Sequence, residues 1–362
     1  APGADARSVA TLQGQLGRCL TSLERFGEAE SFLLRSHESL VGKLGGKSAS
    51  AQMAANALLE LYEKWRKPGE AGRYRSLLTR PTVAAIRELG PLEFRDINGR
   101  QGGFSTRLAG QSAWVFSFTH MSVNRENGSN LQGSTWSWTA DPDAADGIGA
   151  FQNGTGWRDR PAEFLPYTPE ETAYNKAHRD KDCVEDCGSE YVLLPGSPAL
   201  DPVRGGALVF YEKVKASNFP FGTTSFGTSI ALWTDPARQP VRPLTGQEAE
   251  MLFSADEPKW GSAAVAMGED LYAYACGCGN SGCPCLVARV PLADALDRRA
   301  WRFYAGAGRW SATWQDAEPI MDGASQLTVH WNEYLGQYLA VHGIYRGWAI
   351  ALRTADRPEG PW

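Results

Sequence analysis

No apolar run in this 362-residue sequence reaches the roughly 18 residues that a membrane-spanning helix needs. Basic residues are not in excess either, because 36 Lys and Arg stand against 41 Asp and Glu, a formal net charge of −5. A protein that binds nucleic acid through the phosphate backbone is normally basic. We therefore expect neither a membrane span nor a nucleic-acid partner.

Several short motifs are missing as well. The first 25 residues lack the basic start and apolar run of a signal peptide. The sequence has no Walker loop, no Gly-x-Ser-x-Gly and no His-Glu-x-x-His motif. It does contain 39 Gly, 21 Pro and 13 Trp, which is typical of a turn-rich β protein. With 43% hydrophobic residues the chain can bury a core, and its length suits two domains or one domain with an appendage.

Six of the seven cysteines lie in two tight groups: Cys183 with Cys187, and Cys276, Cys278, Cys283 with Cys285. We favour disulfides, with Cys276–Cys285 around Cys278–Cys283 and Cys183–Cys187 as the third. The alternative is a zinc site of four thiolates, for which the C-x-C spacing is tighter than usual. Disulfides imply an oxidising compartment, so we expect an extracellular, periplasmic or cell-surface protein.

Residues 8–78 are rich in Ala, Leu, Glu and Arg and contain one proline, Pro68, which predicts a helical segment. Apolar residues recur there at three- and four-residue spacing, the pattern of one buried helix face. We expect that face to bury Leu12, Leu16, Cys19, Leu20 and Leu23.

The helical segment also contains an internal repeat. The triplet Gly-Glu-Ala starts at Gly27 and again at Gly69, a period of 42 residues. Such a period indicates stacked helical hairpins, and the segment resembles tetratricopeptide repeats in their longer form. A four-helix cap without repeat function is the alternative. Two repeats are fewer than the three or so that stable arrays need, so residues 8–78 are expected to lean on the next domain or to continue a longer array. A protein partner or self-association through residues 8–78 is a further expectation.

From about residue 92 the pattern changes to short β-rich runs between turn residues. Clear examples are 113–116, 207–211, 270–275 and 338–342. About 270 residues at ~40–50 per blade allow five or six propeller blades, and a pair of β-sandwiches is the alternative. The domains predicted are a helical module at 1–80, a linker at 81–91 and a β-propeller at 92–362.

Several phrases of the β region agree, in order, with those of a known family. They are residues 98–105, 114–119, 137–139, 174–178, 256–261, 289–296, 329–336 and 358–362. Together they resemble a bacterial family of secreted, propeller-like domains that includes endo-D-arabinanases. The resemblance covers about 92–362. It implies a five-bladed, glycosidase-like propeller, a polysaccharide ligand, and a last blade that is incomplete where this chain ends.

Glycoside hydrolysis ordinarily uses two carboxyl groups that face one pocket. The resemblance implies an Asp in an Arg-Asp-Gly-Gly phrase and another in a Phe-Gly-Asp-Thr phrase, but the corresponding residues here are Gln101 and Phe118. An amide can hydrogen-bond a sugar but cannot exchange a proton, and a phenyl ring can only stack. The sequence therefore predicts a non-catalytic protein that binds carbohydrate or serves as a scaffold.

The expected ligand-binding side chains are aromatic or neutral polar: Gln101, Phe118, His120, Trp138, Trp260, His330 and Asn332. Core packing remains the alternative for the tryptophans, as does a buried structural role for His330. If the protein is instead an active hydrolase, its acids would be Glu257, beside Trp260, and Asp96. A third possibility is a structural subunit that assembles through its helices.

No cofactor is expected. The acidic turn at Asp141, Asp143 and Asp146 lacks the distal Glu of a calcium loop, so we interpret it as a solvated turn, with calcium as the alternative.

Overall fold

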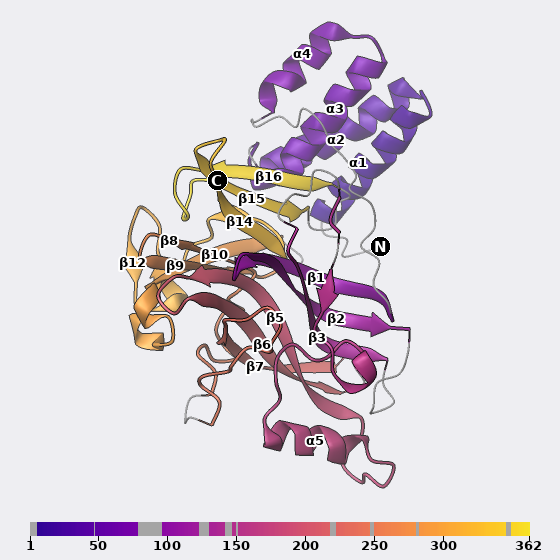
Figure 1. The fold of residues 1–362 in the computed structure, drawn as a ribbon. Coiled ribbons are helices and arrows are strands. Elements are labelled where there is room, and N and C mark those ends of the chain that lie inside the picture. The colour runs from indigo at the N-terminus through magenta and orange to yellow at the C-terminus, as the bar shows by residue number, and fades with distance from the viewer. Residues whose placement is uncertain are drawn as a thin grey trace. The chain divides into compact units, whose positions relative to one another are not determined.

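The computed structural model describes residues 6–46, 48–78, 96–122, 130–141, 147–149, 151–217, 222–246, 250–279, 282–344 and 349–362. Helices occupy the N-terminal part and antiparallel strands the rest (Figure 1). The predicted change from helices to strands is confirmed, because the helices end at Leu77 and the first strand begins at Ile97. The predicted linker at 81–91 lies outside the described residues. None of the described helices combines the length and apolar character needed to cross a bilayer.

Four helices cover the segment predicted to be helical: α1 (Ala6–Ser22), α2 (Phe26–Leu44), α3 (Ala49–Lys64) and α4 (Pro68–Leu77). The Ser48 side chain caps α3 by accepting a hydrogen bond from the Ala51 amide. Pro68 opens α4, where its missing N–H costs nothing. The helices pack in sequence order around buried Leu33, Leu58 and Tyr62.

The predicted buried face of α1 is wrong. Of its five residues only Leu20 is buried, whereas Leu12 is 63% exposed, Leu16 46% and Leu23 67%, and Cys19 is exposed too. Helix α1 instead turns its opposite side to α2, where a side chain at Gly17 would collide with Leu33. Periodicity identifies residues that share a helix face, but it does not say whether a neighbour covers that face.

The strands form four antiparallel sheets. The first contains β1 (Ile97–Leu108), β2 (Gln111–Met121), β3 (Leu131–Thr139) and β4 (Gln152–Asn153). The second contains β5 (Ser189–Asp201), β6 (Gly206–Ser217) and β7 (Gly222–Trp233), preceded by α5 (Pro169–Arg179).

The third sheet contains β8 (Ala263–Met267), β9 (Asp270–Cys276), β10 (Pro284–Pro291), β11 (Arg302–Tyr304) and β12 (Trp310–Ser311), with β13 (Met321–Asp322) paired to β10. The fourth contains β14 (Leu327–Asn332), β15 (Gln337–Gly343) and β16 (Ile350–Ala355). A mainly β fold of small antiparallel sheets is thus confirmed. The finer prediction of five blades is not, because the described strands make four sheets and no closed propeller.

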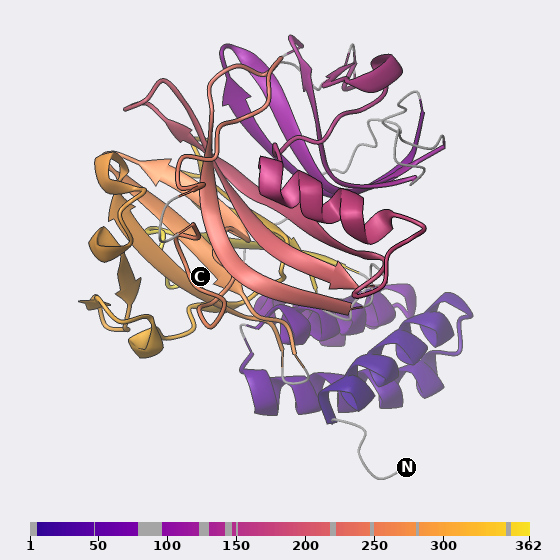
Figure 2. The same ribbon diagram turned by 90° about the horizontal axis from the view of Figure 1, so that it is seen from below.

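Strand β6 contributes to two hydrophobic cores because successive side chains of a strand point to opposite sides. Val209 packs with Val115 and Trp136 of the first sheet. The next residue, Phe210, packs with Trp260 and the third sheet. The second sheet is therefore covered on both faces, as the continuous apolar run at 207–211 of β6 requires (Figure 2).

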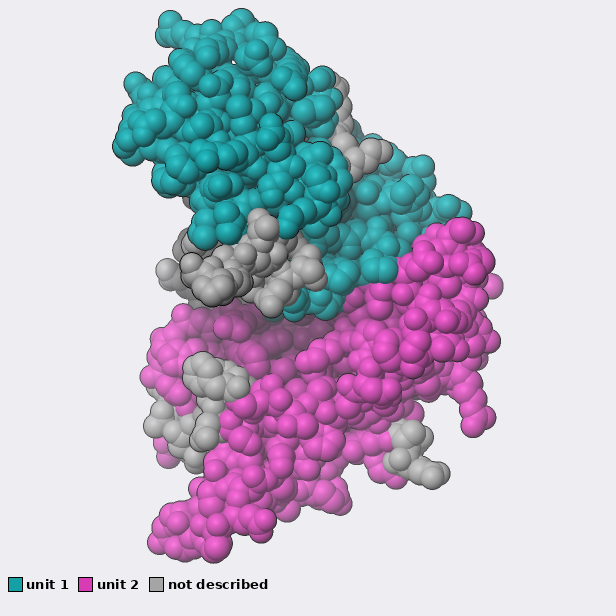
Figure 3. Space-filling view, turned by 180° about the vertical axis from the view of Figure 1, so that it is seen from behind, with its two compact units in different colours: residues 1–86, 276–285, 319–362 teal, residues 87–275, 286–318 magenta. Residues whose placement is uncertain are grey.

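The chain divides into two compact units (Figure 3). The first contains residues 1–86, 276–285 and 319–362, and the second contains residues 87–275 and 286–318. The predicted domain boundaries stay a prediction.

The three disulfides pair as predicted: Cys183–Cys187, Cys276–Cys285 and Cys278–Cys283. Sulfurs bonded in this way are not thiolates, so the bonded form cannot supply the four zinc ligands that were the alternative. Cys19 remains as a free, exposed cysteine.

We expect one reactive thiol in each oxidised chain, because six of the seven cysteines are paired. Thiol titration of the denatured protein should find one group before reduction and all the cysteines after it. The variant Cys19→Ser should give none before reduction. Three or more thiols in the unreduced protein would contradict the pairing.

Candidate functional site

Two of the residues predicted to bind a ligand, Gln101 and His120, lie on the first sheet, near the start of β1 and at the end of β2. Gln101 is exposed on β1, between two irregularities in the pairing with β2. His120 is exposed at the end of β2, with its Nε2 atom 3.0 Å from the Asn130 Nδ2 atom. Asp96 precedes β1 in a left-handed conformation (φ 64°), and its carbonyl accepts a hydrogen bond from the Ser122 amide. Gln101 and His120 are thus open to solvent.

The three predicted aromatic platforms are not free surfaces. Phe118 is half-buried against Val192 and Val214. Trp138 is 8% exposed and Trp260 is 2% exposed, each within a hydrophobic core. Neither tryptophan offers a ring face to a sugar in this structure, so the core-packing alternative describes both.

Glu257 is held by an arginine. Its Oε1 atom accepts a hydrogen bond from Arg298 Nε at 3.0 Å, and its Oε2 atom accepts one from the same guanidinium at 2.6 Å. The Glu257 side chain is only 7% exposed. Asp96 precedes the first sheet, whereas Glu257 precedes the third. The carboxylate proposed as a general acid is therefore buried and ion-paired with Arg298.

His330 and Asn332 lie on β14, in the other compact unit. His330 is exposed. The Asn332 side-chain oxygen accepts a hydrogen bond from the Leu335 amide at 2.9 Å and so closes the turn between β14 and β15. The predicted site residues therefore do not gather in one pocket within either unit. Of the acidic turn, Asp143 and Asp146 lie outside the described residues.

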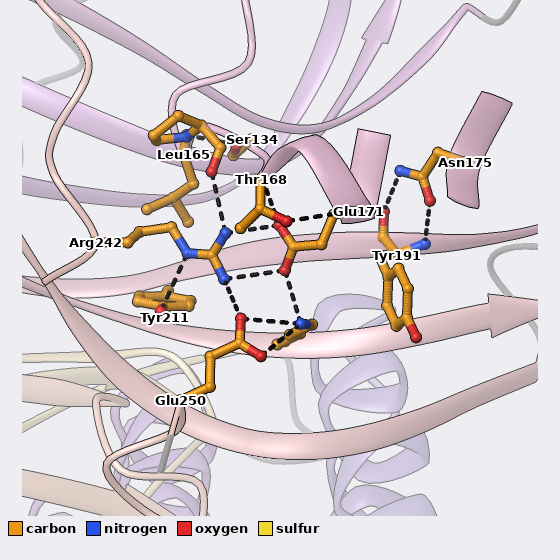
Figure 4. Close-up of polar contacts among 11 residues, drawn as sticks. Ser134, Leu165, Thr168, Glu171, Asn175, Tyr191, Tyr211, Arg242 and Glu250 are labelled. Carbon is orange, nitrogen blue, oxygen red and sulfur yellow. Dashed lines mark hydrogen bonds and ion pairs between the residues drawn. The ribbon is translucent and has the colours of Figure 1, made fainter. Parts of the chain in front are cut away.

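The structure instead brings together a cluster of charges, three buried and one half-buried, that the sequence did not point to. We define the charge cluster as Glu171, Lys213, Arg242 and Glu250 (Figure 4). The Arg242 guanidinium donates to both Glu171 oxygens, at 2.7 and 3.1 Å, and to Glu250 at 3.2 Å. Lys213 Nζ lies 2.7 Å from Glu171 and 3.0 Å from Glu250. Two cations thus bridge two carboxylates.

Local sequence explains how Glu171 enters the cluster. Thr168 and Glu171 form a capping box at the start of α5: the Glu171 amide donates to the Thr168 hydroxyl at 3.1 Å, and the Thr168 amide donates to the Glu171 carboxylate at 2.9 Å. Asn175, one turn further, donates to the Tyr191 carbonyl and accepts from its amide. Helix α5 is thereby fastened to the edge strand β5 (Figure 4).

Burial makes the charges of the cluster interdependent. The side chains of Glu171 and Arg242 are each 3% exposed. Burial raises the pKa of Glu171, but hydrogen bonds from Arg242 and Lys213 outweigh it, so this pKa lies below its usual value. Burial lowers the pKa of Lys213, and its bonds to Glu171 and Glu250 likewise reverse the shift, so this pKa is raised. Both groups therefore stay charged at neutral pH.

The cluster is poorly suited to proton transfer. A general acid or base works best when its pKa lies near the operating pH. The pKa values of Glu171 and Lys213 are shifted away from neutrality. The carboxylates of Glu171 and Glu250 lie close together, as two catalytic acids would. However, both are already ion-paired with Lys213 and Arg242. The arrangement can brace a surface, but it cannot supply the two acids of a hydrolase.

A row of aromatic rings lies beside the charge cluster. We define the aromatic row as Tyr174, His178, Tyr191 and Phe226. Successive ring centres are 3.7 Å apart from His178 to Tyr174, 4.6 Å from Tyr174 to Tyr191, and 5.6 Å from Tyr191 to Phe226. Phe226 is 40% exposed, and the other three are half-buried. The row is therefore a partly exposed strip of rings.

Polar groups border this strip. Lys213 Nζ lies 4.9 Å from the centre of the Tyr191 ring, a cation–π contact. The Tyr174 hydroxyl is 2.8 Å from the Ser189 hydroxyl. Asp186 accepts a hydrogen bond from Lys215 Nζ at 2.8 Å. The strip therefore combines apolar ring faces with hydroxyl and charged groups at its margin.

A separate cavity of about 430 Å³ lies where hairpin turns of three sheets meet. It is lined by residues 107–109, 200–202, 205, 206, 266 and 268. Its one acid, Asp201, is 2% exposed and accepts hydrogen bonds from the Arg204 guanidinium and the Val203 amide. None of the predicted site residues lines this cavity. No group of three His, Cys, Asp or Glu side chains is placed to hold a metal ion in the part of the chain that the structure describes.

One signal in the sequence could have pointed to this region. The Thr-Pro-Glu-Glu phrase at 168–171 is a capping-box pattern that predicts the start of α5. Nothing local predicts that Glu171 meets Arg242, which is 71 positions away. The aromatic row likewise joins residues from α5, β5 and β7.

One protein family matches part of the chain. A family described as a domain of unknown function (DUF4185) matches residues 231–362. The match lies within the predicted resemblance at 92–362, although it does not name endo-D-arabinanases. A search of curated proteins found no match.

Several solved structures of glycoside hydrolases resemble the fold weakly. A family 117 glycoside hydrolase from the marine bacterium Zobellia galactanivorans has a TM-score of 0.42 and 10% identity, covering 75% of this chain and 71% of that one. The α-L-arabinofuranosidase of Podospora anserina has a TM-score of 0.34 and 12% identity, and the match covers 76% of this chain and 70% of that one. The family 62 α-L-arabinofuranosidase of Coprinopsis cinerea has a TM-score of 0.36 and 11% identity, with the same coverage of the two chains.

Arg242→Met should lower the free energy of unfolding by about 3–5 kcal/mol, because it leaves buried Glu171 with one cation in place of two. Chemical denaturation measures the loss. The matched control is Arg238→Met, which removes an 83% exposed guanidinium from a surface pair and should cost about 1 kcal/mol or less. Equal effects of the two variants would contradict the role given to the cluster.

Stability should also depend on pH through Glu171. Because the folded-state pKa is lowered, its contribution is complete above the unfolded pKa of about 4.3 and is lost as pH falls through the folded value. The free energy of unfolding should therefore fall more steeply below about pH 4.5 in the wild type than in Glu171→Gln. Parallel pH profiles from denaturation would disprove this contribution.

Proposed function

We propose that this chain is an extracellular carbohydrate-binding or scaffold protein without hydrolase activity. The finer features of the proposal are a glycosidase-like propeller for the β region and tetratricopeptide-like packing for the helices. The three disulfides support an oxidising compartment, where such bonds persist.

The state of the acidic side chains supports the absence of catalysis. Hydrolysis needs one carboxyl group that gives up a proton and a second that attacks or activates water. Gln101 and Phe118 occupy the positions where the resemblance implies acids. The Glu257 carboxylate is ion-paired with Arg298, and the Glu171 carboxylate is ion-paired with Arg242 and Lys213.

The aromatic row is the observation that carries the binding proposal. The C–H faces of a sugar ring pack against aromatic rings, which supply large contact area at little conformational cost. Phe226 is the exposed end of the row, and Tyr191 joins it to Tyr174. Because the charge cluster fixes α5 and β6, the rings are held in place before a ligand arrives. We assign the polysaccharide to this row, with Lys213 and Glu250 at its edge.

Binding can be tested with a polysaccharide panel that includes D-arabinan, scored for both retention of the protein and release of sugar. The wild type should be retained by at least one polysaccharide and should release no product. Phe226→Ala should weaken that retention about tenfold, the loss expected for one exposed aromatic contact of about 1.4 kcal/mol.

The matched control is Tyr334→Ala, which removes a 95% exposed ring that is outside the row, and it should bind like the wild type. Unchanged retention in Phe226→Ala would disprove the assignment to the aromatic row. Product release that Glu257→Gln abolishes would replace the whole proposal with an active hydrolase.

A further inference from the structure

The cavity of about 430 Å³ lies where three neighbouring strands end. Strand β5 contacts β1 on one side and β8 on the other. The lining comes from the last residues of these strands and from the hairpin turn that follows each of them. All of the lining residues belong to one compact unit. A cavity of this volume is within the range of small-molecule binding sites.

The three hairpin turns leave this space open. Each turn contains a residue in the left-handed conformation: Ala109 (φ 49°), Gly205 (φ 72°) and Gly268 (φ 58°). A Cβ atom on Gly205 or on Gly268 would meet no heavy atom of the described residues within 4 Å. The strands can therefore reverse direction tightly, and the two glycines add no side chain to the space between the turns.

The acid that lines the cavity is already ion-paired. Asp201 is 2% exposed, and its Oδ2 atom accepts a hydrogen bond from the Arg204 guanidinium at 2.9 Å. Its Oδ1 atom accepts hydrogen bonds from the Val203 and Arg204 amides. The same guanidinium donates to the carbonyls of Leu292 and Ala293, at 3.0 and 2.8 Å. This wall is therefore held in place by the protein itself, and its carboxylate is not available to a ligand.

The base that lines the cavity is not compensated in this way. Arg107 is exposed near the end of β1. Within the part of the chain that the structure describes, its guanidinium has no hydrogen bond or ion pair. A guanidinium can bind a carboxylate through two parallel hydrogen bonds. The unbalanced charge of the lining is therefore positive and favours an anionic ligand.

The remaining side chains of the lining are aliphatic. Leu200 is 47% exposed, and Ala109, Pro202 and Ala266 line the cavity with it. No aromatic ring is among the described residues of the lining, although aromatic rings are the surfaces on which sugars usually pack. An aliphatic chain that covers Leu200 would remove apolar surface from water, which is favourable.

We propose that this cavity binds a small aliphatic carboxylate. The carboxylate pairs with the Arg107 guanidinium, and the apolar chain lies against Leu200 and Ala266. One guanidinium matches the single negative charge of a carboxylate. The cavity is separate from the aromatic row, because Tyr191 and Leu200 are about 30 Å apart along β5. The proposal therefore does not depend on the binding of a polysaccharide.

The test is a titration of the intact protein, with hexanoate as the probe and ligand-observed NMR as the measurement. Binding of hexanoate should saturate. Acetate lacks the apolar chain and hexylammonium reverses the charge, so each should bind at least about tenfold more weakly. Added salt should weaken the binding of hexanoate, because Arg107 is exposed and its charge is screened.

Variants of the lining locate the site. Arg107→Gln should weaken hexanoate binding about tenfold, because the charge-assisted hydrogen bonds are lost. Leu200→Asp should weaken it at least as much, because it replaces an apolar contact by a negative charge. Both positions are exposed, so the variants should unfold at the same temperature as the wild type. The matched control is Arg238→Gln, which removes an 83% exposed guanidinium elsewhere in the same unit and should bind normally.

Three results would overturn the proposal. The first is the absence of saturable hexanoate binding by the wild type. The second is equal affinity for hexanoate and hexylammonium, which would show that the charge of the cavity does not select the ligand. The third is unchanged affinity in a folded Arg107→Gln protein, which would place the bound hexanoate elsewhere on the molecule.

Discussion

The ion pair between Glu171 and Arg242 is the constraint on which the candidate site depends. A carboxylate that is 3% exposed is stable only beside cations, so α5, β6 and the chain after β7 must meet at one point. This requirement places Tyr174 of α5 next to Tyr191 of β5 and so creates the aromatic row. It also keeps Glu171 ionised, which removes it from proton chemistry. One interaction thus orders the proposed binding surface and keeps Glu171 ionised.

Local sequence patterns predicted the helices at 8–78, the change to strands near residue 92 and the three disulfides. These features depend on spacing within a few residues. The charge cluster depends on pairs such as Glu171–Arg242, which are 71 positions apart and have no local signature. Single-residue chemistry also misled the prediction for Trp260. A tryptophan beside an acid suits a sugar site, but the same residue fills a core, and only packing distinguishes the two.

The helical segment shows a different limit. The spacing of Leu12, Leu16 and Leu20 correctly groups apolar residues on α1, yet among the residues that the structure describes only Leu20 of these three is buried. Helix α3 offers a comparison, because Leu58 lies 42 residues after Leu16. Leu58 is buried, since α1 and α2 pack against α3. The 42-residue period therefore carries more information than the helical period. The 42-residue period identifies which residues of α1 correspond to packed residues of α3, whereas the helical period shows only that apolar residues share a face.

The order of strands within the sheets has a consequence for how the protein is made. Among the strands that the structure describes, each pairs with a neighbour in the sequence except β13, which pairs with β10. Contacts of short sequence separation form fast, and N-terminal parts fold first during synthesis. The first, second and fourth sheets can therefore each form as soon as their own consecutive strands are available. The third sheet differs, because β13 pairs with β10 and so must join across a connection that already contains β11 and β12.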